Sequence, residues 1–178
     1  GTVKFYTRPS FEKGTSIAQN TMLGSHKYFQ SITQLNSSDT NYSLNVNYGH
    51  IETDGYRPSG NGLKNFVNIN GEYKLNPKQR LTLFASQGFS YEKVSGQISY
   101  NDYYAGIDNG NPSYIVKGSG SKIHSTRVGL GHIWEISKNF KNSTTVFYSS
   151  INQDRIADKA FEVSSSPNVG FRTVFQHN

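Results

Sequence analysis

Apolar and polar residues alternate with a period of two over much of the chain. In residues 42–48 the apolar side chains, among them Leu44 and Val46, are separated by serine and asparagine. Similar runs occupy residues 67–75 and 81–86. Because successive side chains of a β-strand point to opposite faces, this alternation predicts strands with one apolar and one polar face.

The connections between these runs differ in length. The second and third runs are joined by a short polar turn at residues 76–79, whereas the first and second are joined by a long glycine-rich stretch. We predict short turns at residues 36–40, 76–79 and 137–142, and long loops at residues 52–62, 95–121 and 154–168. Short turns that alternate with long loops are typical of outer-membrane β-barrels.

Composition also favours a membrane barrel. Hydrophobic residues make up 34% of the 178 residues and aromatic residues 13%, and there is no cysteine. A soluble domain so poor in aliphatic residues has little with which to fill a core, yet its aromatic content argues against disorder. Both facts are reconciled if the apolar faces meet lipid and the polar faces meet water. The sequence therefore predicts an all-β fold, an antiparallel transmembrane β-barrel segment of about eight strands.

The alternation assigns side chains of residues 41–89 to two faces. The predicted lipid face carries Tyr42, Leu44, Val46, Tyr48, Val67, Ile69, Tyr73, Leu81, Leu83 and Phe89. The predicted lumen face carries Ser43, Asn45, Asn47, Asn68, Asn70, Glu72, Lys74, Thr82 and Ser86. Tyrosines near strand ends, and Trp134 close to a turn, suit the aromatic girdles of a barrel.

Two other classes of protein remain open at this point. A soluble antiparallel β-sandwich, such as a carbohydrate-binding module that uses loop tyrosines, explains the alternation equally well but the unequal connections less well. The net charge of +6 and the pI of about 9.4, together with the aromatic residues, suggest a second alternative, an OB-like nucleic-acid binder. Lysine and arginine are scattered rather than clustered, so we predict no nucleic-acid partner.

The sequence offers no catalytic set. The five histidines lack the spacing of metal ligands, and the acids at Asp154, Asp158 and Glu162 fit a solvated loop. We therefore predict no enzyme activity, no metal and no cofactor. No run approaches 18 apolar residues, and residues 1–6 lack the layout of a secretion signal, which favours a mature chain or a piece of a longer one.

Two short motifs resemble those of TonB-dependent outer-membrane receptors. Residues 1–9 (GTVKFYTRP) resemble the closing strand of that family's plug domain, and residues 54–57 (DGYR) resemble the start of an outer loop. The resemblance covers essentially the whole chain as a pattern. It implies that residues 1–14 end the plug and lead into the barrel. Residues 15–178 would then form the first strands of a 22-stranded barrel.

The resemblance also implies a function and a location. Members of this family take up scarce nutrients across the outer membrane: ferric siderophores, haem, vitamin B12 or glycans. The TonB complex supplies energy through the plug. For this chain the implied function is receptor and transporter for a ferric siderophore or a similar nutrient, located in the cell outer membrane and in contact with its lipid. The short turns would face the periplasm, and cargo would meet the long loops first.

Six loop residues are candidates for contact with cargo. Tyr56 can stack on a planar ligand and Arg57 can bind a carboxylate or phosphate, although both residues could instead brace their loop. The other four candidates share one long loop: Tyr100, Tyr103, Tyr104 and Tyr114. Aromatic side chains in such a loop serve either recognition or packing of the loop on itself.

Overall fold

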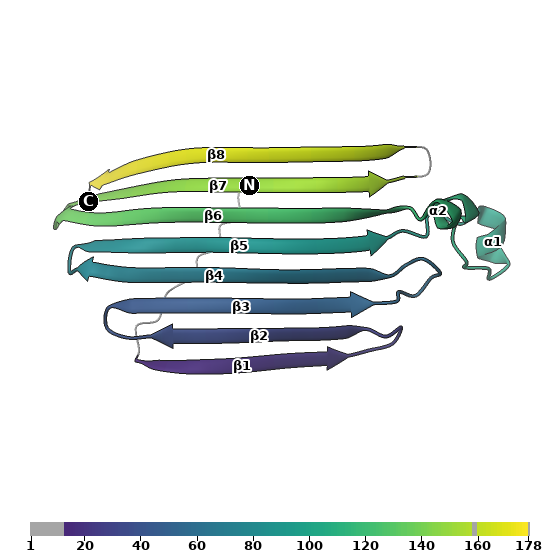
Figure 1. The fold of residues 1–178 in the computed structure, drawn as a ribbon, viewed down its shortest axis with the longest axis horizontal. Helices are drawn as coiled ribbons and strands as arrows, with labels where there is room; N and C mark the ends of the chain where they lie inside the picture. Colours follow the sequence, from purple (N-terminus) through teal and green to yellow (C-terminus); the bar gives the residue numbers. More distant parts are fainter. Residues whose placement is uncertain (1–12, 158–159, 178) are drawn as a thin grey trace.

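The computed structural model describes residues 13–157 and 160–177, which form eight antiparallel strands and two short helices. Each strand pairs with its neighbours in the chain, so one sheet runs in sequence order from β1 to β8 (Figure 1). The strands are β1 (Gly14–Leu23), β2 (Phe29–Ser38), β3 (Tyr42–Thr53), β4 (Gly62–Asn76), β5 (Gln79–Lys93), β6 (Gly120–Ser137), β7 (Phe140–Ile156) and β8 (Phe161–His177). Helices α1 (Tyr100–Tyr104) and α2 (Pro112–Lys117) lie between β5 and β6. Within this part of the chain no helix has the length and apolar character needed to cross a bilayer.

The pairing register places the predicted apolar residues on one side of the sheet. Val46 lies opposite Leu35 on β2 and Ile69 on β4, and Leu83 lies opposite Leu130 on β6. We call this side the apolar face; in β3–β5 it carries the predicted lipid-face residues from Tyr42 to Phe89. The other side, the polar face, carries the predicted lumen-face residues from Ser43 to Ser86. The predicted division into two faces is confirmed.

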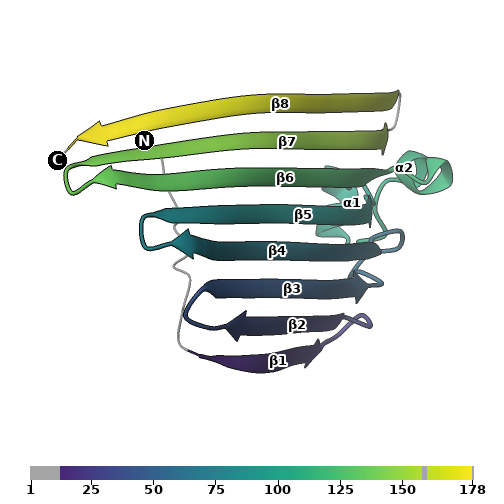
Figure 2. The ribbon, with the colours of Figure 1, turned by 60° about the vertical axis from the view of Figure 1, so that its left-hand side comes forward.

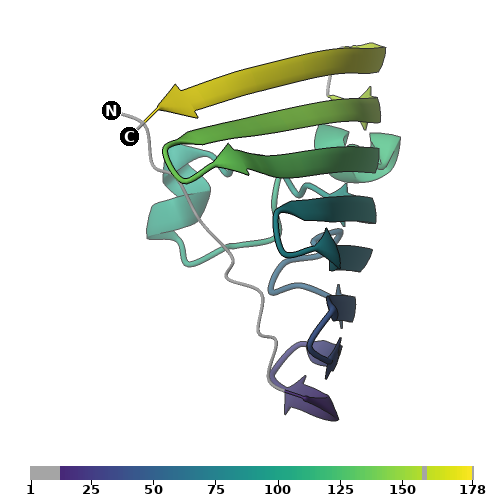
Figure 3. The same cartoon turned by 90° about the vertical axis from the view of Figure 1, so that its left-hand side faces the viewer.

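The sheet forms a single layer. Figure 3 looks along the strands and shows one curved wall of strands with no second sheet packed against it. Among the described residues no hydrophobic side chain is buried, and Leu130, Val169 and Phe171 on the apolar face are largely exposed. In a sandwich, side chains of this kind are enclosed between two sheets. The soluble-sandwich interpretation is therefore not favoured.

The polar face is the concave one. It lines an open groove of about 1070 Å³ whose walls include Asn45, Asn47 and Asn70. The amide of Asn47 donates to Asn45 at 2.6 Å, and Asn45 donates in turn to Asn36 at 2.5 Å. Hydrogen bonds of this kind satisfy polar groups along the groove. An apolar convex face and a hydrogen-bonded concave face together describe the wall of a barrel.

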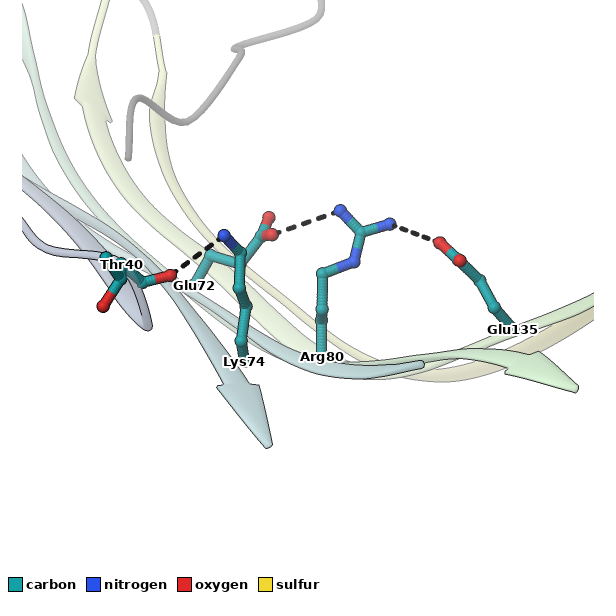
Figure 4. A network of polar contacts seen from close by, with 5 residues as sticks. All are labelled: Thr40, Glu72, Lys74, Arg80 and Glu135. Carbon is teal, nitrogen blue, oxygen red and sulfur yellow. Dashed lines mark hydrogen bonds and ion pairs between the residues drawn. The ribbon is translucent and has the colours of Figure 1, made fainter. Parts of the chain in front are cut away.

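A charged network crosses the polar face near the short turns (Figure 4). Arg80 on β5 lies between two carboxylates, with Nη1 3.3 Å from Glu72 on β4 and Nη2 3.4 Å from Glu135 on β6. Lys74 donates to the carbonyl oxygen of Thr40 at 3.0 Å. Because Arg80 bridges its two neighbouring strands, it pairs charges that would otherwise line the groove singly.

The connections at the two ends of the sheet are unequal, as predicted. Short turns join β2 to β3, β4 to β5 and β6 to β7 at one end (Figures 1 and 2). At the opposite end lie residues 24–28, 54–61 and 94–119. Residues 94–119 are not wholly irregular, because α1 and α2 occupy their middle. Ser99 and Asn111 act as N-caps, since the side chain of each accepts a backbone N–H of the helix that follows it.

The prediction of a long loop at residues 154–168 is wrong. Strand β7 continues to Ile156 and β8 begins at Phe161, so the connection is residues 157–160 alone. Serines at 164–166 and Pro167 have the composition of a loop, but their backbone pairs with β7 in an uninterrupted register. The predicted strand within residues 1–9 lies outside the described residues, and the predicted domain boundary at residue 14 stays a prediction.

Gly120, the first residue of β6, sits where no side chain fits. A Cβ atom there would lie 2.3 Å from the carbonyl oxygen of Glu92 on the neighbouring strand. We expect Gly120→Ala to lower the free energy of unfolding by about 2 kcal/mol, because the backbone of β5 must shift. Urea unfolding followed by the fluorescence of Trp134 measures this change.

Gly71→Ala is the matched control for that prediction. A Cβ at Gly71 would meet Leu83 at 3.6 Å, an ordinary van der Waals contact. We expect a change below about 0.5 kcal/mol. Equal effects of the two substitutions would contradict the proposed clash.

Candidate functional site

The long connections gather at one end of the sheet and carry all six candidate residues. Tyr56 belongs to residues 54–61 and is exposed, with its ring edge-on to His26 at a centroid distance of 5.6 Å. His26 belongs to residues 24–28, so this contact joins two neighbouring connections. Tyr56 therefore presents most of its ring to solvent while one side rests against another loop.

Arg57 points into the connection between β5 and β6. Its Nε lies 2.5 Å from Oδ1 of Asp108, and its Nη1 donates to the carbonyl oxygen of Gly96 at 3.4 Å. The two side chains are 34% and 31% exposed. At that level of burial an ion pair is partly shielded from water, so removing one charge costs more than it does in a fully exposed pair. The guanidinium thus links two loops in this structure.

Further hydrogen bonds reinforce the same junction. The hydroxyl of Ser95 donates to the carbonyl oxygen of Pro58 at 2.7 Å, and the backbone N–H of Asn111 donates to the carbonyl oxygen of Ser95 at 2.6 Å. Ser95 is buried. We call Arg57, Pro58, Ser95, Asp108 and Asn111 the loop clamp. It fixes residues 94–119 against residues 54–61.

Tyr114 packs inside its own connection. It lies in α2, and its ring covers Gly96, where an added Cβ would lie 2.7 Å from the ring. Gly96 has φ = 72°, a backbone conformation that other residues rarely adopt. Tyr114 is half-buried. Of the two roles left open by the sequence, packing of the loop on itself describes Tyr114.

The remaining three tyrosines form an exposed group on α1. Tyr100, Tyr103 and Tyr104 are 75%, 68% and 69% exposed. The rings of Tyr100 and Tyr104 are 4.5 Å apart, and those of Tyr103 and Tyr104 are 5.4 Å apart and perpendicular. A hydrogen bond to Tyr104 raises the pKa of Tyr100 above its ordinary value. We call these three residues the tyrosine cluster.

Several residues of this end had no signal in the sequence. Asp108 precedes Asn-Gly and has the composition of a turn, and its partner Arg57 lies on a different connection. Lys27 pairs with Asp54 at 2.5 Å, and the hydrogen bond and charge of that carboxylate raise the pKa of Lys27.

The described residues contain no group of three or more histidine, aspartate or glutamate side chains placed to hold a metal ion.

Comparison with known proteins identifies the fold. No protein-family model matches the chain, and no curated protein is similar to it in sequence. Among solved structures, the open form of the ferric-catecholate import receptor Fiu from E. coli K12 superposes with a TM-score of 0.64 at 13% identity, over 94% of this chain. The closed form of the same receptor superposes with a TM-score of 0.64 at 13% identity, over 93% of this chain.

This likeness confirms the predicted fold class. The chain has the fold of a segment of an outer-membrane barrel, with eight antiparallel strands in meander order. It spans 30% of the length of the open-form receptor and 27% of the closed-form one. At 13% identity the comparison describes architecture, and it leaves the six candidate residues as predictions.

Proposed function

We propose that this chain is part of a TonB-dependent outer-membrane receptor that imports a ferric siderophore. The observation that carries the proposal is the joint architecture: a barrel wall with its apolar face outward, and an aromatic cluster at its long-loop end. The fold is shared with a receptor that imports ferric catecholates. The chain performs no chemistry of its own in this proposal; it binds cargo and forms part of the passage.

The tyrosine cluster is the proposed first contact with cargo. Three exposed rings offer flat faces and edges that stack on planar groups such as the aromatic rings of a siderophore. A tyrosine phenol is neutral at pH 7, so these rings add no negative charge that would repel an anionic iron complex. Tyr56, exposed on the neighbouring connection, is the proposed secondary contact.

The loop clamp has a supporting role in this proposal. Of the two roles left open for Arg57, bracing of the loops is supported by the contacts of its guanidinium with Asp108 and Gly96. We assign Arg57 and Tyr114 to holding residues 94–119 in place, so that α1 presents its rings outward. Their loss would act on cargo through the position of the tyrosine cluster.

The remaining parts of the receptor follow from the same proposal. Residues 1–14 would end a plug domain that fills the groove on the polar face, and residues 15–178 would form the first strands of the barrel. The short turns would face the periplasm, and the long connections the exterior. The TonB complex would act through the plug. Outer-membrane lipid would surround the apolar face.

Uptake of iron tests the proposed function. The complete receptor is expressed as the sole siderophore receptor of a Gram-negative host and supplied with radio-iron complexes of catecholate, hydroxamate and haem type. We expect accumulation of at least one complex, and loss of accumulation but not of surface binding in a host without TonB. Failure to bind any of these complexes, or uptake that persists without TonB, would refute the proposal.

A further inference from the structure

The apolar face changes character along its length. On β6 it carries Trp134, His132, Leu130 and Val128, and it continues through Thr126 and His124 to Lys122 at the long-loop end. On β7 the same face runs from Val146 and Tyr148 to Asn152 and Asp154, whereas on β5 it ends in the aromatic residues Phe89 and Tyr91. Residues of the apolar face beyond this change, on β5 to β7, are Phe89, Tyr91, His124, Lys122, Asn152 and Asp154.

The height of Lys122 above Trp134 along the membrane normal follows from the geometry of a tilted strand. A strand tilted by about 40° advances about 2.5 Å along the membrane normal per residue. Lys122 is twelve residues from Trp134 along β6 and so lies about 30 Å above it. The apolar band of such barrels is about 25 Å tall. If Trp134 marks the periplasmic girdle, Lys122 lies just outside the hydrocarbon, at the level of the lipid headgroups.

The side chains at that height are paired by ring contacts. The ammonium group of Lys122 lies 5.8 Å from the ring centroid of Tyr91, and the rings of Phe89 and His124 are 4.8 Å apart. Asp154 is the cross-strand partner of Lys122 on β7, yet Lys122 forms no ion pair with any carboxylate of the described residues. Its charge is therefore available to a ligand outside the barrel.

We propose that Lys122 and Tyr91, flanked by Phe89 and His124, bind the phosphorylated sugar headgroup of the outer-leaflet glycolipid. The occupant follows from continuity, because whatever adjoins the acyl chains along the apolar face is a headgroup. It also follows from chemistry. An ammonium group binds phosphate, and aromatic rings beside polar groups bind sugars. This inference rests on the proposed outer-membrane location.

The opposite face supplies a matched control. Lys64 on β4 lies 5.9 Å from the ring centroid of Phe66, nearly the same geometry as Lys122 on Tyr91. Lys64 pairs with Ser90 on β5, one residue before Tyr91, so it lies at a similar height. It belongs to the polar face and points into the barrel. If the headgroup binds on the exterior, substitution of Lys122 lowers the affinity for glycolipid and substitution of Lys64 does not.

The test uses the complete receptor in nanodiscs of phosphatidylethanolamine and phosphatidylglycerol, titrated with deep-rough lipopolysaccharide. Hydrogen exchange of β5 and β6 amides reports binding. Lys122→Gln is expected to weaken binding about fivefold, the effect of about 1 kcal/mol per lysine at a charged membrane surface. Tyr91→Leu is a second variant that is expected to weaken it similarly, and Lys64→Gln should bind within about twofold of wild type.

Each outcome decides the proposal. Equal effects of Lys122→Gln and Lys64→Gln, no effect of Lys122→Gln and Tyr91→Leu, or equal protection by inorganic phosphate alone would overturn it. Cell fractionation separates this failure from failure of the proposed function. A receptor found in the outer membrane whose Lys122 variant binds glycolipid normally refutes the headgroup site alone, whereas a receptor found elsewhere refutes both.

Discussion

Replacing Tyr100, Tyr103 and Tyr104 by alanine is expected to lower the affinity for the iron complex about 100-fold. An aromatic ring that stacks on a ligand contributes about 1 kcal/mol, so three rings contribute about 3 kcal/mol. The side chains are exposed and α1 is capped by Ser99, so their removal leaves the fold intact. Titration of radio-iron siderophore on whole cells measures the dissociation constant.

Two controls sharpen this result. The triple phenylalanine variant keeps the rings and is expected to retain most of the affinity, because stacking rather than the hydroxyl groups carries the interaction. Val116→Ala removes an exposed apolar side chain from α2 in the same connection and should leave affinity unchanged. If the alanine variant binds within twofold of wild type, the tyrosine cluster is not the cargo contact.

The strands were predictable because their signal is local. Period-two alternation in residues 42–48 and 67–75 places Leu44, Val46 and Ile69 on one face whatever the rest of the chain does. Short polar turns such as residues 76–79 then force neighbours to pair as hairpins. Register follows, because a shift by one residue would turn every apolar side chain to the wrong face.

The errors arose where distant pairing overrides local composition. Pro167 and the serines before it resemble a loop, yet β7 supplies a partner for every residue of β8. Helix α1 is an error of another kind, because a short helix forms where the sequence predicts an irregular loop. Its asparagine, aspartate and tyrosines have low helix propensity, and a cap at Ser99 with one turn of backbone hydrogen bonds holds it. Neither outcome is readable from a window of a few residues.

The sequence names the candidate residues of the loops, but it does not show which of them pack against the protein and which face solvent. Tyrosines in a long loop are visible in the sequence, but burial separates Tyr114 from the tyrosine cluster. Arg57 is a plausible ligand contact until its partner is known. That partner, Asp108, is on another connection, and only the folded arrangement of the two loops brings the charges together.

Removing the charge of that partner is expected to weaken cargo binding about tenfold. Asp108→Asn leaves the Arg57 guanidinium partly buried without its carboxylate, at a cost of about 1–2 kcal/mol after allowance for its exposure. The cost appears as loosening of residues 94–119 and hence of α1. Two measurements are needed: the dissociation constant for the iron complex, and hydrogen exchange of the amides in residues 94–119, which should accelerate.

Lys27→Gln tests whether partial burial of the ion pair is the reason for the expected effect of Asp108→Asn. The Lys27–Asp54 pair has the same 2.5 Å separation as Arg57–Asp108, but its side chains are 83% and 57% exposed. Solvent screens such a pair, so we expect cargo affinity and exchange rates close to those of wild type. Should Lys27→Gln and Asp108→Asn have equal effects, the loop clamp does not position the tyrosine cluster. Should Asp108→Asn weaken binding without faster exchange, the carboxylate acts on cargo directly.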